Sequence, residues 1–161
     1  MLNRHFLDFL GLLEKHRVEY LVIGGYAVAA HGFPRFTGDL DVFVAISREN
    51  ARHMLEVFAE FGFASLNLTE KDFLEPDIVI EVGREPMKIQ VLTGIDGISF
   101  ERCRADRIMV EAGGLQIPFI GLDSLLVNKA ASNRAKDQID FAELTRLQRL
   151  RERPGDGPKE G

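Results

Sequence analysis

Hydrophobic positions alternate between helical and strand periods along most of the chain. Apolar residues at positions 2, 6, 9, 10 and 13 share one face of a helix, so a first helix should end near His16. The wholly apolar run Tyr20–Ile23 predicts a buried strand. The alanine-rich segment Tyr26–Ala30 predicts a short helix, which Gly32 and Pro34 stop.

The next two predicted elements are a strand and a helix. Asp39–Ala45 alternates charged and apolar residues before becoming wholly apolar, as expected of a strand with one end in a site and the other in the core. Ser47 is a suitable N-cap for a third helix, whose apolar stripe falls at positions 51, 54, 55, 58 and 61.

A hairpin is predicted from two apolar runs, Ile78–Val82 and Met87–Leu92, around the turn at 83–86. If this four-residue loop sets the register, the facing pairs are Val82 with Met87, Glu81 with Lys88, and Val79 with Gln90.

The C-terminal part predicts a second hairpin and two helices. Ile108–Glu111 and Leu115–Phe119 flank the turn Ala112-Gly113-Gly114, and no helical pattern follows these glycines. Asp123-Ser124 begins a helix through Ala131. A last helix runs from about Asp137 to Glu152, with its inward side chains at Phe141, Leu144, Leu147 and Leu150.

This order of elements predicts an α+β fold, with a mixed sheet flanked by helices and with C-terminal helices. At 161 residues, 45% of them hydrophobic and twelve of them Phe, the chain has the length for one core. We therefore predict a single domain over residues 1–152. The tail 153–161, with two prolines and three glycines, predicts disorder.

Composition narrows the classes of partner. The net charge of -5 lacks the basic excess needed for an extended surface on duplex nucleic acid, so any such contact should be local. The longest apolar stretch, Tyr20–Phe33, contains three glycines and is shorter than the roughly 20 residues that span a bilayer. The single Cys103 excludes an internal disulfide and favours the reducing cytoplasm.

Two carboxylates one residue apart are the first candidate for chemistry. Asp39 and Asp41 lie on a predicted strand, where residues two apart point to the same face. Like charges this close repel, and a divalent cation between them would remove the conflict. The simpler interpretation is a solvated start of the strand, just after the turn Thr37-Gly38, that needs no metal.

Gly24-Gly25 is the second candidate, because it stands where an apolar strand changes into a helix. Backbone N–H groups at a helix start can hold a phosphate, although any tight turn uses glycine for its backbone freedom. Thirteen residues separate Gly25 from Asp39. The combination of a phosphate cradle and an acidic pair on the next strand is far more specific than either motif alone.

These two motifs resemble those of the nucleotidyltransferase superfamily of the DNA polymerase β type. The residues Gly24-Gly25-Tyr26-Ala27, His31-Gly32 and the run 35–41 are most similar to small bacterial proteins of the AbiEii toxin and minimal nucleotidyltransferase groups. The later segment 125–140, with Asn128-Lys129, Arg134 and Lys136-Asp137, is similar to their C-terminal helices. The resemblance covers about residues 20–148.

The resemblance implies a two-metal transfer of an NMP from an NTP to a hydroxyl of a protein or RNA. Asp39 and Asp41 would be catalytic and hold Mg²⁺ or Mn²⁺. Gly24 and Gly25 would contact the triphosphate. Additional phosphate contacts would come from Arg35 and Thr37 and, more weakly, from Lys129, a residue type that is usually just solvated on a helix face. A toxin-antitoxin or phage-defence role is also implied.

One position departs from the superfamily pattern. Catalytic members carry a third carboxylate on a later strand, and the matching position here is Gln90. An amide can coordinate a metal through its oxygen but cannot accept a proton. Glu81, on the same predicted hairpin face, could replace the missing acid, although pairing with Lys88 is the favoured interpretation. The positions of Glu75, Asp77 and Asp96 cannot be fixed from the sequence.

Three functions therefore compete. The first is a metal-dependent nucleotidyltransferase. The second is a module of the same fold that binds a nucleotide or a protein and has lost its chemistry at Gln90. The third, a structural α+β domain with chance motifs, ranks lowest because the glycines, acids and strand order would all have to agree by accident.

Overall fold

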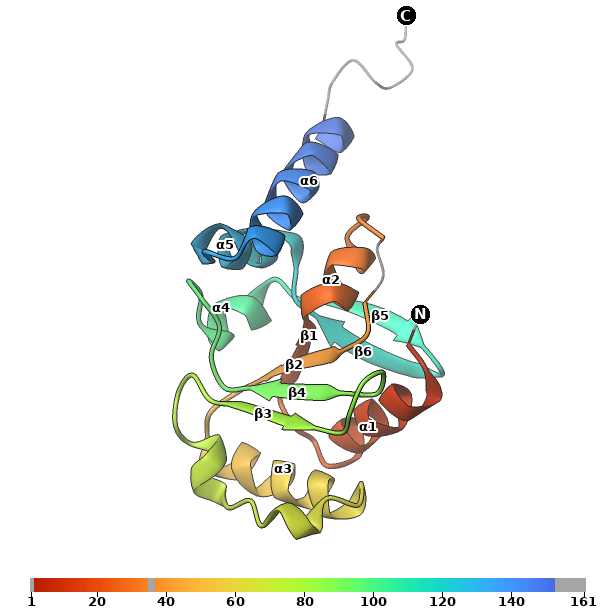
Figure 1. The fold of residues 1–161 in the computed structure, drawn as a ribbon, viewed down its shortest axis with the longest axis vertical. Coiled ribbons are helices and arrows are strands. Elements are labelled where there is room, and N and C mark those ends of the chain that lie inside the picture. Colours follow the sequence, from red (N-terminus) through yellow and green to blue (C-terminus); the bar gives the residue numbers. More distant parts are fainter. Residues whose placement is uncertain (1, 35–36, 153–161) are drawn as a thin grey trace, which may run out of the picture.

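A six-stranded mixed sheet forms the centre of the computed structural model, which describes residues 2–34 and 37–152 (Figure 1). The strands are β1 (Tyr20–Ile23), β2 (Leu40–Val44), β3 (Val79–Val82), β4 (Ile89–Leu92), β5 (Ile108–Ala112) and β6 (Leu115–Phe119). Their order across the sheet is β3-β4-β2-β1-β6-β5. The predicted α+β fold, with a mixed sheet, flanking helices and C-terminal helices, is confirmed.

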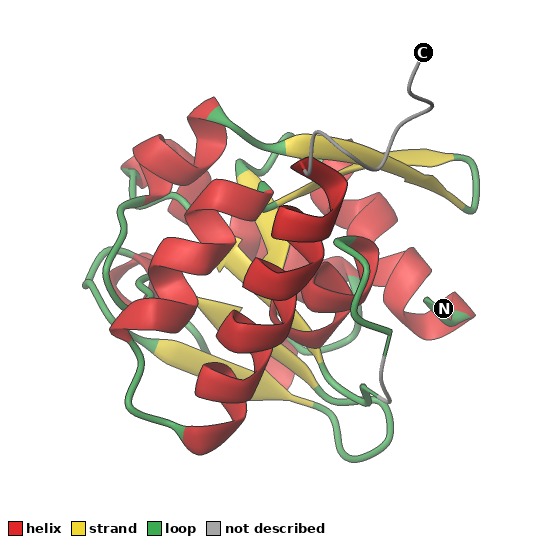
Figure 2. Cartoon of the chain, turned by 90° about the horizontal axis from the view of Figure 1, so that it is seen from above, coloured by secondary structure: helices red, strands yellow, loops and turns green. Residues whose placement is uncertain are grey.

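Helices cover both faces of the sheet. They are α1 (Arg4–Lys15), α2 (Gly24–Ala30), α3 (Arg48–Glu60), α4 (Phe100–Ala105), α5 (Leu122–Ala131) and α6 (Ala135–Glu152), with short 3-10 turns η1 (Ala64–Leu66) and η2 (Glu70–Phe73). Figure 1 shows α1 and α3 below the sheet and α2, α5 and α6 above it. The view from above in Figure 2 shows helices lying over the strands. Within the described ranges, every helix is too short or too polar to cross a membrane.

The strand pairing brings three polar residues into one row across the sheet. β2 runs parallel to β4, with Asp41 opposite Gln90, and β3 runs antiparallel to β4, with Glu81 opposite Gln90. On the other side of β2, Ile23 at the end of β1 lies opposite Asp41. Side chains in one row of a sheet point to the same face. The row therefore ends at the point where β1 passes into α2.

The core lies on both sides of the central strands, and one part of it is a cluster of phenylalanines. Phe58 on α3 packs against Phe9 on α1 and against Phe63 and Phe73, with ring centroids 5.9 to 6.3 Å apart. Phe58 and Phe73 are buried almost completely, as is the thiol of Cys103 in α4. The aromatic cluster attaches the first helix and the 3-10 turns to α3.

Helical and strand periods predicted most elements correctly. The first helix, β1, both hairpins and the start of α3 agree with the structure, and Ser47 caps α3 by accepting a hydrogen bond from the Asn50 N–H. Several details differ from the predictions. Helix α2 begins at Gly24 instead of Tyr26, α6 begins at Ala135 instead of about Asp137, and Asp39 lies just before β2. The helix α4 had not been foreseen. Leu150 in α6 is exposed.

The predicted register of the first hairpin was also wrong, by two residues. Val82 pairs with Ile89, Glu81 with Gln90 and Val79 with Leu92. The turn is longer than four residues, because the Met87 N–H bonds to the Arg84 carbonyl and ladder pairing starts only at Ile89. A shift of two preserves the face of every side chain, so Glu81 and Gln90 still share one face.

Two predictions fall outside the described residues. Arg35, a candidate phosphate ligand, is one of them. The other is the tail 153–161.

We expect Phe58→Ala to lower the free energy of unfolding by about 3 to 5 kcal/mol, because it removes a ring buried among three others. Urea denaturation followed by circular dichroism measures this loss. The exposed Leu66, on η1, is the control: Leu66→Ala should change stability by no more than about 0.5 kcal/mol. Equal losses for the two variants would show that the cluster does not hold the helices together.

Candidate functional site

The two glycines predicted to contact phosphate lie directly against the acidic strand. Gly24 has φ +73°, and a Cβ added there would lie 2.2 Å from Oδ2 of Asp41. Gly25 is equally tight, because a Cβ there would lie 2.2 Å from Oγ1 of Thr37. At Gly24, no other residue type allows the backbone this conformation and this approach together. The structure thus brings together four of the residues selected from the sequence.

Two cavities meet at Asp41. One, of about 480 Å³, is lined by residues from β1 to β4 and from the α5–α6 region, among them Gly24, Glu81, Gln90, Asn128 and Arg134. The other, of about 260 Å³, is lined by Gly25, Thr37, Gly38, Asp39, Asp41, Glu85 and Lys136. Asp41 therefore lines two neighbouring cavities, each with polar side chains in its wall.

Each acid of the pair has one buried oxygen without a hydrogen-bond partner among the described residues. Oδ1 of Asp39 and Oδ1 of Asp41 are both buried, and neither has a hydrogen-bond partner within the described part of the chain. Burial, and secondly the charge of Asp39, raise the pKa of Asp41 to about 6. A buried carboxylate oxygen without a partner is costly. Both acids are thus held in an arrangement that a cation would stabilise.

The residues present suit Mg²⁺ or Mn²⁺, which bind carboxylate and amide oxygens. Asp39 and Asp41 offer two carboxylates, and Gln90 lies opposite Asp41 on the neighbouring strand. Among residues 2–34 and 37–152, no three His, Cys, Asp or Glu side chains come together as a metal-binding group.

Gln90 is connected to a carboxylate of its own. Its Nε2 donates a hydrogen bond of 2.6 Å to Oε2 of Glu81, and both side chains line the larger cavity with Asp41. The expected pairing of Glu81 with Lys88 is present only as a longer contact of 3.9 Å. The amide nitrogen of Gln90 is therefore engaged by Glu81, which leaves its oxygen for other contacts.

Lys88 was not selected as a site residue from the sequence. Its Nζ lies 3.8 Å from Oδ2 of Asp39 and 3.6 Å from Oε2 of Glu85. The charge of Asp39, followed by that of Glu81, raises the pKa of Lys88. The sequence feature that could have identified Lys88 is its position two residues before Gln90, which places both side chains on one face of the hairpin.

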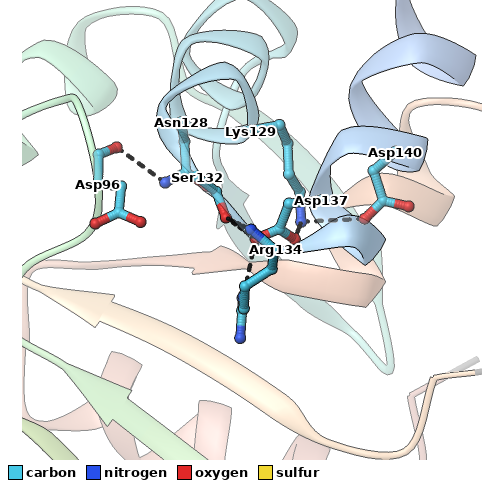
Figure 3. A network of polar contacts seen from close by, with 7 residues as sticks. All are labelled: Asp96, Asn128, Lys129, Ser132, Arg134, Asp137 and Asp140. Atoms are coloured by element: carbon cyan, nitrogen blue, oxygen red, sulfur yellow. Dashed lines mark hydrogen bonds and ion pairs between the residues drawn. The ribbon is translucent and has the colours of Figure 1, made fainter.

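Lys129 lines the larger cavity, but it is not the solvated helix lysine that its residue type suggests. Its ammonium is buried and contacts Asp137 and Asp140 in a polar network between α5 and α6 (Figure 3). Asp137 and Asp140 are thus partners in buried ion pairs. Of the other acids, Asp96 lines the larger cavity, whereas Asp77 lines a separate one beside Phe43 and Phe100.

We expect Asp41→Asn to stabilise the metal-free protein at pH 8 by about 2 to 3 kcal/mol. The folded-state pKa lies above the unfolded value, so the folded state binds the extra proton. Asp41 therefore costs stability as the pH rises from about 4 to 6, and the cost is complete above 6.

Urea denaturation in EDTA at pH 4 and pH 8 measures this difference. The gain for Asp41→Asn should nearly vanish at pH 4. The control is Asp123→Asn, the same change at an exposed position on α5, which should show no such pH dependence. A gain that is equal at both pH values would contradict a desolvated Asp41.

Comparisons with solved structures show the same fold in several nucleotidyltransferases. The proposed nucleotidyltransferase TM1012 from Thermotoga maritima matches with a TM-score of 0.54 at 17% identity, over 94% of this chain and 93% of that chain. The lincomycin-bound lincosamide adenylyltransferase LnuA matches with a TM-score of 0.54 at 15% identity, over 90% and 97%. ANT(2")-Ia in complex with adenylyl-2"-tobramycin matches with 0.51 at 9% identity, over 88% and 86%.

At these identities the structural likeness shows a common fold and nothing more. A search of curated protein sequences found no match. The model of one family, described as "Nucleotidyl transferase of unknown function (DUF2204)", matches residues 3–153, almost the whole chain. The chain therefore belongs to this nucleotidyl transferase family.

Proposed function

We propose that the protein is a metal-dependent nucleotidyltransferase that moves an NMP from an NTP to a hydroxyl group of a protein or RNA. One observation carries the proposal. In a nucleotidyl transferase family member, two carboxylate oxygens without hydrogen-bond partners lie beside a Gly-Gly turn that has no room for a side chain. Such a site suits a cation together with a polyphosphate.

Asp39, Asp41 and the oxygen of Gln90 are the residues that would hold Mg²⁺ or Mn²⁺. The bound cation would neutralise the charge that develops on the phosphates during transfer. Gly24, Gly25 and Thr37 border the carboxylates and would contact the triphosphate through backbone N–H and hydroxyl groups. Arg35 remains a prediction for the same role.

Glu81 is our candidate for the general base that accepts the hydroxyl proton, a role that the amide of Gln90 cannot fill. In the transfer, the acceptor hydroxyl oxygen forms a bond to the α-phosphorus, and the bond to pyrophosphate breaks. The hydroxyl proton must go to a base within hydrogen-bond reach. Glu81 lines the same cavity as Asp41, and the 2.6 Å hydrogen bond from Gln90 fixes one of its oxygens.

The acceptor and the biological setting rest on the resemblance described above. The net charge of -5 argues for a local contact with RNA or protein instead of an extended basic surface. We place the reaction in the cytoplasm, where NTPs are made, and in a toxin-antitoxin or phage-defence pair. Growth arrest on expression in a bacterial host, lost with Asp39→Asn, would support that setting.

A second function is favoured by Gln90 itself. If Glu81 does not act as the base, the same site binds a metal and a nucleotide without transferring it. The protein would then be a nucleotide-binding or protein-interaction module of the family fold.

We expect Mg²⁺ with a non-hydrolysable NTP, at a hundredfold excess over its Kd, to raise Tm by about 5 to 10 °C. Differential scanning calorimetry with each of the four nucleotides measures this shift. The double variant Asp39→Asn, Asp41→Asn should lose the shift relative to its own baseline, whereas the exposed control Asp123→Asn should keep it. A wild-type protein that shows no shift with any nucleotide would contradict both functions.

Catalysis is tested by measuring the transfer of label from α-labelled NTPs to acceptors in a cell extract. A separate assay offers hydroxylated small molecules as acceptors. We expect Glu81→Gln to lower label transfer by about 10² to 10⁴-fold while leaving the Tm shift intact, because a base acts on the chemical step and not on nucleotide binding.

The matched control is Glu111→Gln, on the strand at the opposite edge of the sheet. It should transfer label as the wild type does. Unchanged transfer by Glu81→Gln would exclude Glu81 as the base. Nucleotide binding without any transfer by the wild type would favour the binding module.

A further inference from the structure

Three charged side chains are buried together where α5 meets α6. Nζ of Lys129 lies 2.7 Å from Oδ1 of Asp137 and 3.1 Å from Oδ2 of Asp140. The exposed fractions of the three side chains are 6%, 6% and 1%. Charges this deeply buried are costly to desolvate, and the cost is offset only where the geometry is closely defined.

Ser132 and Arg134 complete the network on the side of the site (Figure 3). The Ser132 hydroxyl donates to Oδ2 of Asp137 at 2.7 Å, and Nε of Arg134 donates to the same oxygen at 3.1 Å. The backbone N–H of Arg134 donates to the Ser132 hydroxyl at 3.1 Å. Although burial opposes it, these contacts and the charge of Lys129 lower the pKa of Asp137 to about 2. The end of α5 and the first turns of α6 are therefore joined through one carboxylate.

The segment fixed in this way carries two exposed cations toward the carboxylate site. Arg134 lines the larger cavity and Lys136 the smaller one, and the two cavities meet at Asp41. Figure 3 shows the Arg134 side chain extending from the network toward the strands. Its side chain is 80% exposed although Nε is held by Asp137. The rest of its guanidinium is thus available to an anion in the cavity.

We propose that Lys129 is a positioning residue whose buried contacts with Asp137 and Asp140 fix the start of α6, so that Arg134 and Lys136 hold the polyphosphate of the substrate from two sides of Asp41. This inference rests on the proposed function. It replaces the direct phosphate contact predicted for Lys129 from the sequence, and it adds Arg134 and Lys136 as the phosphate ligands of the C-terminal helices.

The charges around Lys129 favour this role over a direct contact. Its ammonium already faces two carboxylates, so a phosphate brought to it would also approach Asp137 and be repelled. Arg134 and Lys136 are different, because both side chains are exposed and line the cavities that share Asp41. The charges of Lys129, Lys136 and Arg134 all lower the pKa of Asp41 against the larger effect of burial, but only Lys129 is already paired with two buried carboxylates. A polyphosphate beside Asp41 would be attracted by the exposed charges of Arg134 and Lys136.

A substitution at Asp140 distinguishes a positioning role of Lys129 from a direct phosphate contact. The Asp140 side chain is almost fully buried and lines neither of the two cavities that share Asp41. Asp140→Asn preserves the shape of the side chain and removes its charge. If Lys129 acts through the network, this substitution should weaken polyphosphate binding although it touches no ligand. If Lys129 binds phosphate directly, the substitution should leave binding intact.

The probe is inorganic tripolyphosphate with Mg²⁺, measured by isothermal titration calorimetry on the full chain. We expect Arg134→Gln and Lys136→Gln each to weaken binding about tenfold or more, as for lost charge-assisted hydrogen bonds. Asp140→Asn and Lys129→Met should weaken it to a similar degree. The double variant Arg134→Gln, Asp140→Asn should bind no more weakly than the weaker of its two single variants, because both changes disable the same contact.

Arg146→Gln is the matched control: it removes one exposed arginine from the same helix, more than one turn beyond Asp140, the last residue of the network. It should bind as the wild type does. Hydrogen exchange gives a second measurement that needs no ligand. Asp140→Asn and Lys129→Met should speed exchange of the amides at 134–140, and exchange in β1, β2 and β4 should not change.

Each outcome decides one question. Normal binding by Asp140→Asn with a loss in Lys129→Met would show that Lys129 touches phosphate and would overturn the proposal. Unchanged exchange at 134–140 in both variants would overturn it as well. If the wild type binds neither tripolyphosphate nor nucleotide, the proposed function fails, and exchange still shows whether Lys129 fixes α6. If Lys129→Met does not fold, Asp140→Asn alone supplies both measurements.

Discussion

The close contact between Gly24 and the carboxylate of Asp41 is the constraint on which the rest of the site depends. The backbone at the end of β1 passes within van der Waals distance of an acidic side chain on β2, and a methyl group at Gly24 would overlap it. A backbone this near leaves Asp41 partly buried and beside a second acid. The unpaired oxygen of Asp41, its raised pKa and the cavities that it lines all lie at this point of contact.

Local patterns were sufficient to predict the strands and helices that carry this contact. The strand before Gly24-Gly25, the strand from Asp39 and both hairpins have strong periodicity, and the resemblance to known nucleotidyltransferases ordered them into a fold. The hairpin register was predicted wrongly because the Met87 N–H bonds to the Arg84 carbonyl inside the loop, so the first ladder pair is Val82 with Ile89. Helix α4 has only six residues, too few for a helical period to stand out.

Contacts between segments that are distant in the sequence could not be predicted from such local patterns. Lys129 looks like an ordinary helix lysine in the sequence, and only the packing of α5 on α6 shows that it lies between two aspartates. In the same way, Lys88 and Asp39 are 49 positions apart and meet because β2 and β4 are neighbours in the sheet. Residue spacing along one element predicts a face, whereas the partner on another element depends on the full topology.

The raised pKa of Asp41 has a consequence for any cation that would bind it. Below about pH 6 this carboxyl group is mostly protonated, so a divalent ion would have to displace a proton before binding there. Binding would then be a competition between two cations of different charge for the same oxygen, and mild acidification would favour the proton by mass action.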